Sequence, residues 1–235
     1  QHPGYGRRRI LPELEARTGE RINHKRLRWL LRDHELSLQR CLPTHNPSEL
    51  RRILHEHEGK LDLVKGREFG PLEALSTDFT ELHFAGGSQK AWLMAMVDLE
   101  TRWVPGWALG RSANRQLAYD CWERAEDNLL SLQAAVAGVT VHNDQDSVYT
   151  SYGWARQLLI EDRARLSYSE NGARDNPWIE SLWGRIKVEL GSRVTEAATF
   201  GELQEVIDNQ FEYYNTSRRH SALEYETPLE HLRKR

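Results

Sequence analysis

Residues 74–98 read ALSTDFTELHFAGGSQKAWLMAMVD, and the prediction of the fold class begins from this stretch. Ala74–Phe84 is predicted to be extended, and Gly86-Gly87 marks a tight turn. Ala91–Asp98 is a nearly continuous apolar run of the length of a buried strand. The stretch therefore predicts an antiparallel hairpin whose second strand lies inside a sheet.

Downstream of the hairpin, one more strand and then alternating helices and strands are predicted. Trp103–Leu109 is the third strand, in which Pro105-Gly106 indicates a bulge or an edge. The later helices are expected at Asn114–Ser131, Ser151–Asp162, Pro177–Leu190 and Phe200–Tyr214, and the later strands at Val139–His142 and Arg165–Tyr168. Three antiparallel strands followed by this alternation predict an α/β fold, a mixed five-stranded sheet flanked by helices.

The first 40 residues predict a separate helical segment. Arg7–Arg17 is expected to form one helix, although Pro12 fits only its opening turn, and Asn23 is expected to cap a second. The second helix carries Lys25 and Arg26 on its polar face. Two helices joined by a short turn, the second one basic, are typical of a helix-turn-helix, and an ordinary helical hairpin is the alternative.

Residues 41–70 are interpreted as a linker between the segment at 1–40 and a main domain at 71–235 that ends in a helical extension. Proline and glycine punctuate the linker, and a short helix is expected at Glu49–His57. No zinc site is predicted there, because the candidate ligands include no C-x-x-C pair and fit no common spacing. Those candidates are Cys41, His45, His55 and His57.

The charge of the chain is unevenly distributed. Residues 1–40 carry ten Lys and Arg against five Asp and Glu, whereas the remaining 195 residues carry 22 against 30. A basic head on an acidic body suits a DNA-contacting module joined to a domain that gathers carboxylates, and a solvated surface with chance asymmetry is the alternative. No apolar run approaches the roughly 20 residues of a membrane span, and two cysteines indicate a reducing cytoplasm.

Three acidic residues lie where a sheet-based metal site needs them. Asp78 is in the middle of the first strand, and Asp144 follows the strand Val139–His142, where the chain leaves the sheet. Glu180 lies on the helix that begins after Asn176, roughly a quarter turn from the centre of its apolar stripe. Hard divalent cations prefer such oxygen ligands, and three converging acids repel one another without metal. The chain has 35 acidic residues, however, so this selection needs further support.

Several motifs provide that support. His142–Ser151 reads HNDQDSVYTS, Asp175–Ser181 reads DNPWIES, and 35 residues separate Asp144 from Glu180. Residues 74–233 resemble the integrase catalytic core of retroviral integrases and bacterial insertion-sequence transposases. The resemblance is greatest to the OrfB type, which has H-x-D-x-G-S-x-Y-x-S, D-N-x-x-x-E-S and a DD(35)E triad. Residues 1–40 are similar to the helix-turn-helix that precedes this core, and Tyr214-Asn215, Arg218, His220 and Leu223 to its C-terminal motif.

The resemblance implies an RNase H-like fold and a DDE transposase that cleaves DNA 3′ ends and transfers strands during transposition of an insertion sequence. Asp78, Asp144 and Glu180 are the implied catalytic residues and ligands of two Mg²⁺ ions, with Mn²⁺ as a substitute. The implied partners are double-stranded DNA of the transposon ends and target, and further copies of the chain on that DNA. An upstream segment with its own DNA-recognising and oligomerising helices is also implied.

Other residues are assigned more general roles in this hypothesis. DNA contacts are expected from Lys187, Lys25, Arg26, Arg218, Arg219 and His220. The candidates for lining the site are His142, Asn176, Tyr149 and Asp146. Asp146 replaces the glycine of the family motif and adds a carboxylate two residues from Asp144. Glu189, on the same helix as Glu180, is expected to be solvated. The rival hypotheses are a catalytically silent, transposase-derived DNA-binding protein and a host nuclease of RNase H-like fold.

Overall fold

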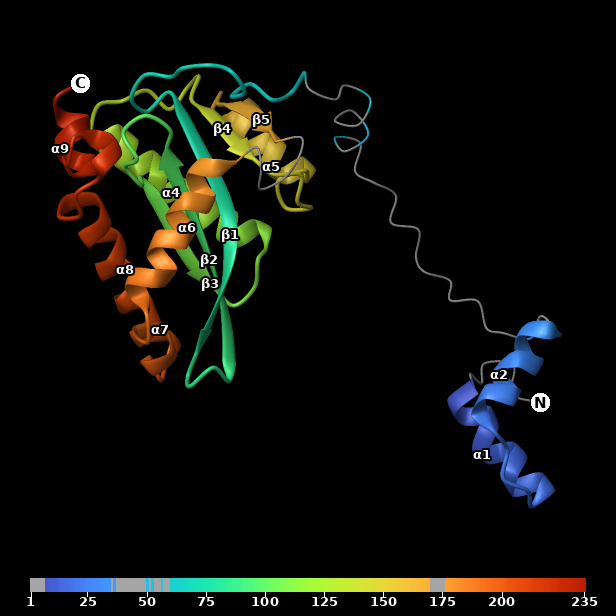
Figure 1. Ribbon diagram of the computed structural model, residues 1–235. Coiled ribbons are helices and arrows are strands. Elements are labelled where there is room, and N and C mark those ends of the chain that lie inside the picture. Colours follow the sequence, from blue (N-terminus) through green and yellow to red (C-terminus); the bar gives the residue numbers. More distant parts are fainter. Residues whose placement is uncertain are drawn as a thin grey trace. The chain divides into compact units, whose positions relative to one another are not determined.

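The structure is a computed structural model that describes residues 7–34, 36, 50, 52, 56, 60–169 and 176–235. Its contacts divide the chain into two compact units, residues 1–46 and residues 47–235 (Figure 1). None of the helices in the described ranges is long and apolar enough to cross a membrane. The four candidate zinc ligands, most of the expected helix at Glu49–His57, and Asp175 lie outside the described residues.

The first unit is a pair of helices, α1 (Arg7–Thr18) and α2 (His24–Asp33). Pro12 lies inside α1 rather than in its opening turn, so the expectation for this position is wrong. Asn23 caps α2 as predicted, because its side chain accepts a hydrogen bond from the backbone N–H of Lys25. Leu27 is the buried residue of α2, and Lys25 and Arg26 are exposed.

The second unit is built on a mixed five-stranded sheet of order β3-β2-β1-β4-β5. The strands are β1 (Ala74–Phe84), β2 (Gln89–Asp98), β3 (Gly106–Gly110), β4 (Thr140–Asn143) and β5 (Arg165–Tyr168). The pairs β1–β2 and β2–β3 are antiparallel, whereas β1–β4 and β4–β5 are parallel. The mixed sheet predicted from the alternation of elements is therefore confirmed.

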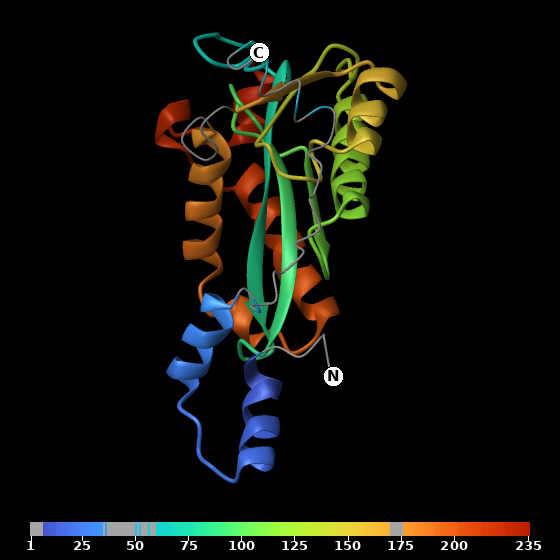
Figure 2. The same cartoon turned by 90° about the vertical axis from the view of Figure 1, so that its right-hand side faces the viewer.

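Helices cover both faces of this sheet (Figure 2). One face packs against α4 (Arg115–Ser131), α5 (Tyr152–Arg156) and a π-helical turn, η1 (Gln157–Glu161). The other face packs against α6 (Pro177–Leu190), α7 (Arg193–Glu196) and α8 (Phe200–Thr216). The two main hydrophobic cores lie one on each side of the sheet, and the central strands are packed between them.

The third strand is shorter than the predicted Trp103–Leu109, because it begins at Gly106. Val104 does not pair with β2, and both its backbone N–H and its carbonyl bond to the side chain of Asn215 on α8 at 2.9 Å. A Cβ on Gly106 would come within 2.4 Å of the carbonyl oxygen of Cys121, so β3 can lie against α4 only with glycine here.

Three short elements escaped prediction: α7, a 3₁₀ turn at Ser221–Leu223, and α9 (Pro228–Arg233). Each is too short for a periodic apolar pattern to appear in the sequence. The predicted helix at Ser151–Asp162 exists as α5 continued by η1, with Ser151 as its cap. The α9 helix begins with a capping box between Thr227 and Glu230.

Candidate active site

The parallel pairing of β1 with β4 brings two of the three acids to the same level. Ser76 lies opposite His142 in this ladder, and Asp78 and Asp144 each follow two residues further along. Both residues are half-buried at the carboxyl end of β4, where the chain turns away from the sheet. The two strands are thus neighbours, as a common site for Asp78 and Asp144 requires.

The surroundings of Asp78 are unfavourable for a negative charge. Burial raises the pKa of its carboxyl from 3.8 to about 7, although the backbone N–H of Phe79 donates to it at 2.7 Å and opposes this rise. After burial, the carboxylates of Asp144, Glu180 and Asp146 contribute to this raised pKa, in this order. All three acids predicted from the sequence therefore belong to one electrostatic neighbourhood.

Glu180 reaches this neighbourhood from the first turn of α6. The apolar stripe of α6 is buried against the sheet, and Glu180 is exposed at the edge of that stripe. Asn176 stands at the N-cap position, where asparagine commonly caps a helix, but its side chain makes no capping hydrogen bond. The amide instead accepts from the hydroxyl of Ser76 and donates to the carbonyl of Thr77 at 3.3 Å. Asn176 thereby fastens the start of α6 to β1 beside Asp78.

Asp146, which replaces the family glycine, is exposed and has a structural role in its turn. Its carboxylate accepts from the backbone N–H of Val148 at 2.8 Å and from the hydroxyl of Ser147 at 3.2 Å. Its own N–H donates to the carboxylate of Asp144 at 2.8 Å. The turn therefore fixes one oxygen of each aspartate and leaves Asp144, the one aligned with Asp78, as the better candidate ligand.

The donor atoms of the site fit a divalent cation in chemistry, although they do not form a closed cage. In the described part of the chain, no three His, Cys, Asp or Glu side chains lie close enough together to hold a metal ion. The amide oxygen of Asn143 and the hydroxyl of Ser169, at the ends of β4 and β5, are buried without a hydrogen-bond partner among the described residues. Repelling carboxylates and unsatisfied oxygens are the ligand type that Mg²⁺ and Mn²⁺ take.

Two candidate lining residues prove to be core residues. His142 is fully buried on β4, and its Nδ1 lies 2.9 Å from the hydroxyl of Ser167 on β5. Tyr149 is fully buried and stacks on Phe79 with ring centroids 5.1 Å apart. Burial raises the pKa of Tyr149 well above its ordinary value, and the charge of Asp78 adds to this effect. Both residues therefore pack in the core next to the strands that carry the acids.

The basic residues predicted to contact DNA lie in different places. Lys187 is exposed, two turns beyond Glu180 on α6. Arg218 and His220 are half-buried after α8, and Arg219 is exposed beside them. Lys25 and Arg26 are exposed on α2 of the first unit.

The expectation that Glu189 is solvated is wrong. Its carboxylate accepts from Arg218 at 2.6 Å and from Gln210 at 2.9 Å. Two further arginines, Arg102 and Arg185, were not predicted as site residues, and they line a cavity together with Arg218. The only sequence signal is for Arg185, which lies one helical turn after Ser181 of the DNPWIES motif.

Two family models cover most of the second unit. Residues 70–173 match one model described as an integrase core domain, and residues 163–228 match another with the same description. The chain belongs to the integrase core domain family. This finding confirms the resemblance drawn from the motifs around Asp144 and Glu180.

Curated relatives of this integrase core domain protein are transposases of insertion sequences. The transposase for IS904 of Lactococcus lactis subsp. lactis (strain IL1403) is 30% identical over 138 residues, which cover 58% of this chain and 53% of the relative. The putative transposase InsK for IS150 of Escherichia coli (strain K12) is 26% identical over 228 residues, which cover 97% of this chain and 77% of the relative. The chain thus spans about half the length of the first of these relatives.

Solved integrases have the same fold. The catalytic core domain of HTLV-2 integrase, solved in complex with magnesium, gives a TM-score of 0.53 at 14% identity, covering 71% of this chain and 99% of the other. A chain of the simian T-cell lymphotropic virus intasome gives 0.57 at 13% identity, covering 71% and 56%. The predicted RNase H-like fold of the integrase core is therefore confirmed.

Proposed function

We propose that this protein is a DDE transposase, which cleaves DNA at the 3′ ends of an insertion sequence and transfers those ends to a target. The observation that carries the proposal is the common electrostatic neighbourhood of Asp78, Asp144 and Glu180. These acids come from β1, the end of β4 and α6, on a core whose curated relatives are insertion-sequence transposases.

Asp78, Asp144 and Glu180 are the proposed ligands of two divalent cations, Mg²⁺ or Mn²⁺. Such ions neutralise the charge that develops on the attacking and leaving oxygens of a phosphodiester. Asp78, whose carboxyl interacts electrostatically with both other acids, would be the ligand that the two ions share. Asn176 holds the α6 backbone against β1, so Glu180 stays at a defined distance from Asp78. Lys187, exposed two turns along α6, binds the DNA backbone in this account.

The remaining parts of the chain have roles in DNA capture. Residues 1–40 form the proposed helix-turn-helix DNA-binding segment, with Lys25 and Arg26 at the phosphates, residues 41–70 the linker, and residues 71–235 the catalytic core. Arg218, Arg219 and His220 add phosphate contacts. The proposed partners are double-stranded transposon ends and target DNA, on which several copies of the chain assemble. The site of action is then the bacterial cytoplasm, on the nucleoid.

A strand-transfer assay tests this proposal. The protein is incubated with Mg²⁺ or Mn²⁺, a labelled duplex that ends in the terminal sequence of its own element, and a plasmid target. We expect nicking followed by joining, and a loss of at least about 10³-fold in Asp78→Asn, Asp144→Asn and Glu180→Gln. Glu123→Gln, which changes an exposed acid of α4, is the matched control and keeps full activity. Binding without cleavage, or hydrolysis without joining, contradicts the proposal.

A further inference from the structure

A cavity of about 570 Å³ lies on the side of α6 that faces α8. Its walls come from α6, from the end of α8 with the loop that follows, and from the turn between β2 and β3. Four arginines line it: Arg102, Arg185, Arg218 and Arg219. The aromatic rings of Trp178, Tyr214 and Tyr225 form part of the remaining wall. The cavity is therefore both strongly basic and partly apolar.

The positive charge of this cavity is only partly balanced. Arg218 is paired with Glu189 at 2.6 Å, and the side chain of Arg219 donates to the carbonyl of Tyr225 at 2.9 Å. Among the described residues, no carboxylate lies within ion-pair distance of Arg102 or Arg185. Asp98 and Glu100 act on Arg102, and Glu230 acts on Arg219, only from beyond ion-pair distance. Arg102 and Arg185 thus keep a positive charge without an ion pair among the described residues, which suits an anion.

The side chain of His220 lies in the wall of the cavity and is affected by the same positive charge. Arg218 donates to its Nε2 at 3.1 Å, so the imidazole is neutral and carries its proton on Nδ1. Burial and, to a smaller extent, the charges of Arg218, Arg185 and Arg102 together lower the pKa of His220 to about 4. Three arginines from three different elements therefore converge on one ring.

The walls of the cavity are preformed. A bridge joins His220 to Glu226, and Glu224 and Tyr225 adopt left-handed backbone angles of 54° and 63° in φ, as does Arg102 with 61°. Such angles cost free energy outside glycine and persist only where the surroundings impose them. The loop after α8 and the β2–β3 turn thus hold their arginines in fixed positions.

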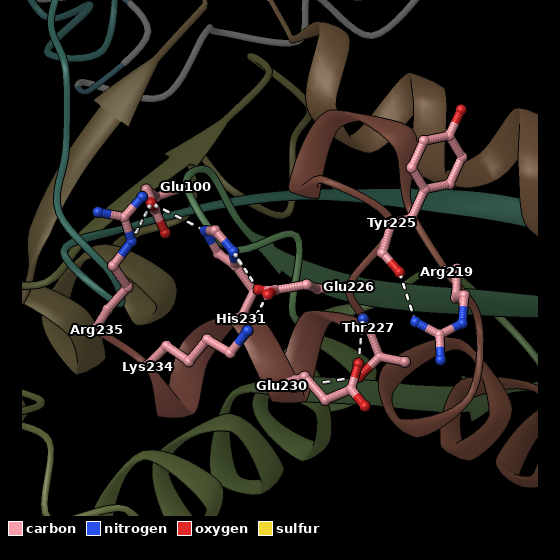
Figure 3. A network of polar contacts seen from close by, with 9 residues as sticks. All are labelled: Glu100, Arg219, Tyr225, Glu226, Thr227, Glu230, His231, Lys234 and Arg235. Atoms are coloured by element: carbon pink, nitrogen blue, oxygen red, sulfur yellow. Dashed lines mark hydrogen bonds and ion pairs between the residues drawn. The ribbon is translucent and has the colours of Figure 1, made fainter.

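A polar network ties these two walls together (Figure 3). His231 of α9 lies between Glu226, at 3.1 Å, and Glu100 of the β2–β3 turn, at 3.4 Å. Arg235 also reaches Glu100 at 3.6 Å, and Lys234 pairs with Glu226. Through α9, the loop that carries Arg219 is thereby anchored to the turn that carries Arg102.

The cavity and the three acids lie on opposite flanks of the same turns of α6. At about 100° per residue, Ser181 and Arg185 point roughly 100° and 140° around the helix from Glu180. Glu180 interacts with Asp78 on one side, and both of the other residues line the cavity on the other side. A helix is about 10–12 Å across, which equals about three base-pair rises of 3.4 Å for a DNA duplex whose axis runs across α6.

We propose that this cavity binds a backbone phosphate of the DNA strand that crosses α6, about three nucleotides from the phosphodiester held by the acids. The inference rests on the proposed function, which supplies the DNA. Arg102 and Arg185 provide the charged hydrogen bonds, and the aromatic wall receives the sugar or base of that nucleotide. The cavity is then a second DNA-binding site, and its distance from the acids determines which phosphodiester binds at the acids.

A methylphosphonate scan tests this inference. Each phosphate of a duplex of about 30 base pairs, ending in the element's terminal sequence, is replaced in turn by a neutral methylphosphonate, and the Kd for the full chain is measured. With the unaltered protein, one position two to four nucleotides from the joined phosphate is expected to weaken binding about 10-fold. The Arg102→Gln/Arg185→Gln variant is expected to bind the unmodified duplex about 10-fold more weakly. A methylphosphonate at the sensitive position should then leave the Kd of this variant unchanged.

The controls separate this inference from the proposed function and from a loss of fold. Arg185 is exposed, so Arg185→Gln alone is expected to keep the melting temperature of the unaltered protein. On a logarithmic scale, this single variant should weaken binding of the unmodified duplex by about half as much as the double variant. Arg156→Gln, which changes an exposed arginine of α5, keeps the sensitive position. If the unaltered protein joins DNA but the double variant has the same scan, the cavity inference fails alone. If no DNA is cut or joined, the proposed function fails.

A free anion is the other source of the same chemistry, and inorganic phosphate is the probe for it. We expect 10 mM phosphate to weaken binding of the unaltered protein to the duplex, but not binding of the double variant, at constant ionic strength. Stabilisation of the unaltered protein by inorganic phosphate, together with a scan that shows no coupling to Arg102 and Arg185, overturns the assignment to DNA.

Discussion

Replacing Asn176 by alanine removes the side chain that joins the start of α6 to β1. Asn176 is 2% exposed, and it accepts from Ser76 and donates to the carbonyl of Thr77. Each buried hydrogen bond contributes about 1 kcal/mol, and a stranded buried partner adds to the loss. We expect Asn176→Ala to lower the free energy of unfolding by about 2–3 kcal/mol, measured by urea denaturation of the metal-free protein.

The same change is expected to weaken metal binding. Asn176 is four residues before Glu180, and Thr77 is next to Asp78, so the lost contact lies between two proposed ligands. Residues that orient metal ligands contribute about 10–100-fold to metal affinity. Titration with Mn²⁺, followed by calorimetry at a temperature where the variant is folded, should show an affinity loss of this size.

Asn215 offers a matched control. It is also a buried asparagine on a helix with two hydrogen bonds to one strand-connecting segment, both to Val104 at 2.9 Å. Asn215→Ala should therefore lose a similar free energy of unfolding, while Mn²⁺ affinity changes by less than about threefold. Equal losses of Mn²⁺ affinity in the two variants, or none in Asn176→Ala, would refute the positioning argument.

Three further predictions concern packing, protonation and DNA capture. Gly106→Ala should lower the free energy of unfolding by more than about 2 kcal/mol, because its Cβ would lie 2.4 Å from a carbonyl oxygen of α4. Gly184→Ala should instead stabilise α6 by up to about 1 kcal/mol, because no atom lies within 4 Å of the added Cβ. Thermal melting of both variants checks this prediction. Burial raises the pKa of Asp98 from 3.8 to about 6, so the folded state binds more protons than the unfolded state between these pH values. The free energy of unfolding should therefore fall by about 2 kcal/mol as the pH rises from about 4 to 6, measured by urea denaturation at each pH. The same fall in Asp98→Asn would count against this prediction. Lys25→Ala/Arg26→Ala should reduce the slope of log Kd against log salt by about two for duplex DNA while Mn²⁺ affinity is retained, and an unchanged slope would exclude these residues from the DNA interface.

Much of the second unit could be predicted because its strands and helices are long enough to have clear patterns. The strand Ala74–Phe84 and the helix Pro177–Leu190 were predicted with the same bounds as observed. Trp103–Leu109 was predicted too long, because the apolar character of Trp103 and Val104 is shared by a strand and by a buried connection. The sequence carries no signal that Asn215, more than 100 residues away, takes the backbone bonds of Val104.

The acids of the site were predictable from motif spacing, whereas their supports and the cavity were not. The parallel partner of β1 is chosen by tertiary packing, so the sequence could state only that Asp78 and Asp144 meet if their strands pair. Asn176 precedes a proline at a helix start, which favours a capping role, yet the polar groups of β1 compete successfully for its amide. Arg102 owes its place to a left-handed turn, for which the residue itself gives no indication.

The most direct test of the account is a crystal structure of the protein grown with Mn²⁺, with anomalous scattering recorded to locate the metal. We expect anomalous density bonded to oxygens of Asp78 and Asp144 at about 2.1 Å, with Glu180 turned toward the same density. Density at other side chains, or none with Asp78 and Asp144 left apart at high Mn²⁺ concentration, would contradict the claim that these acids form the metal site.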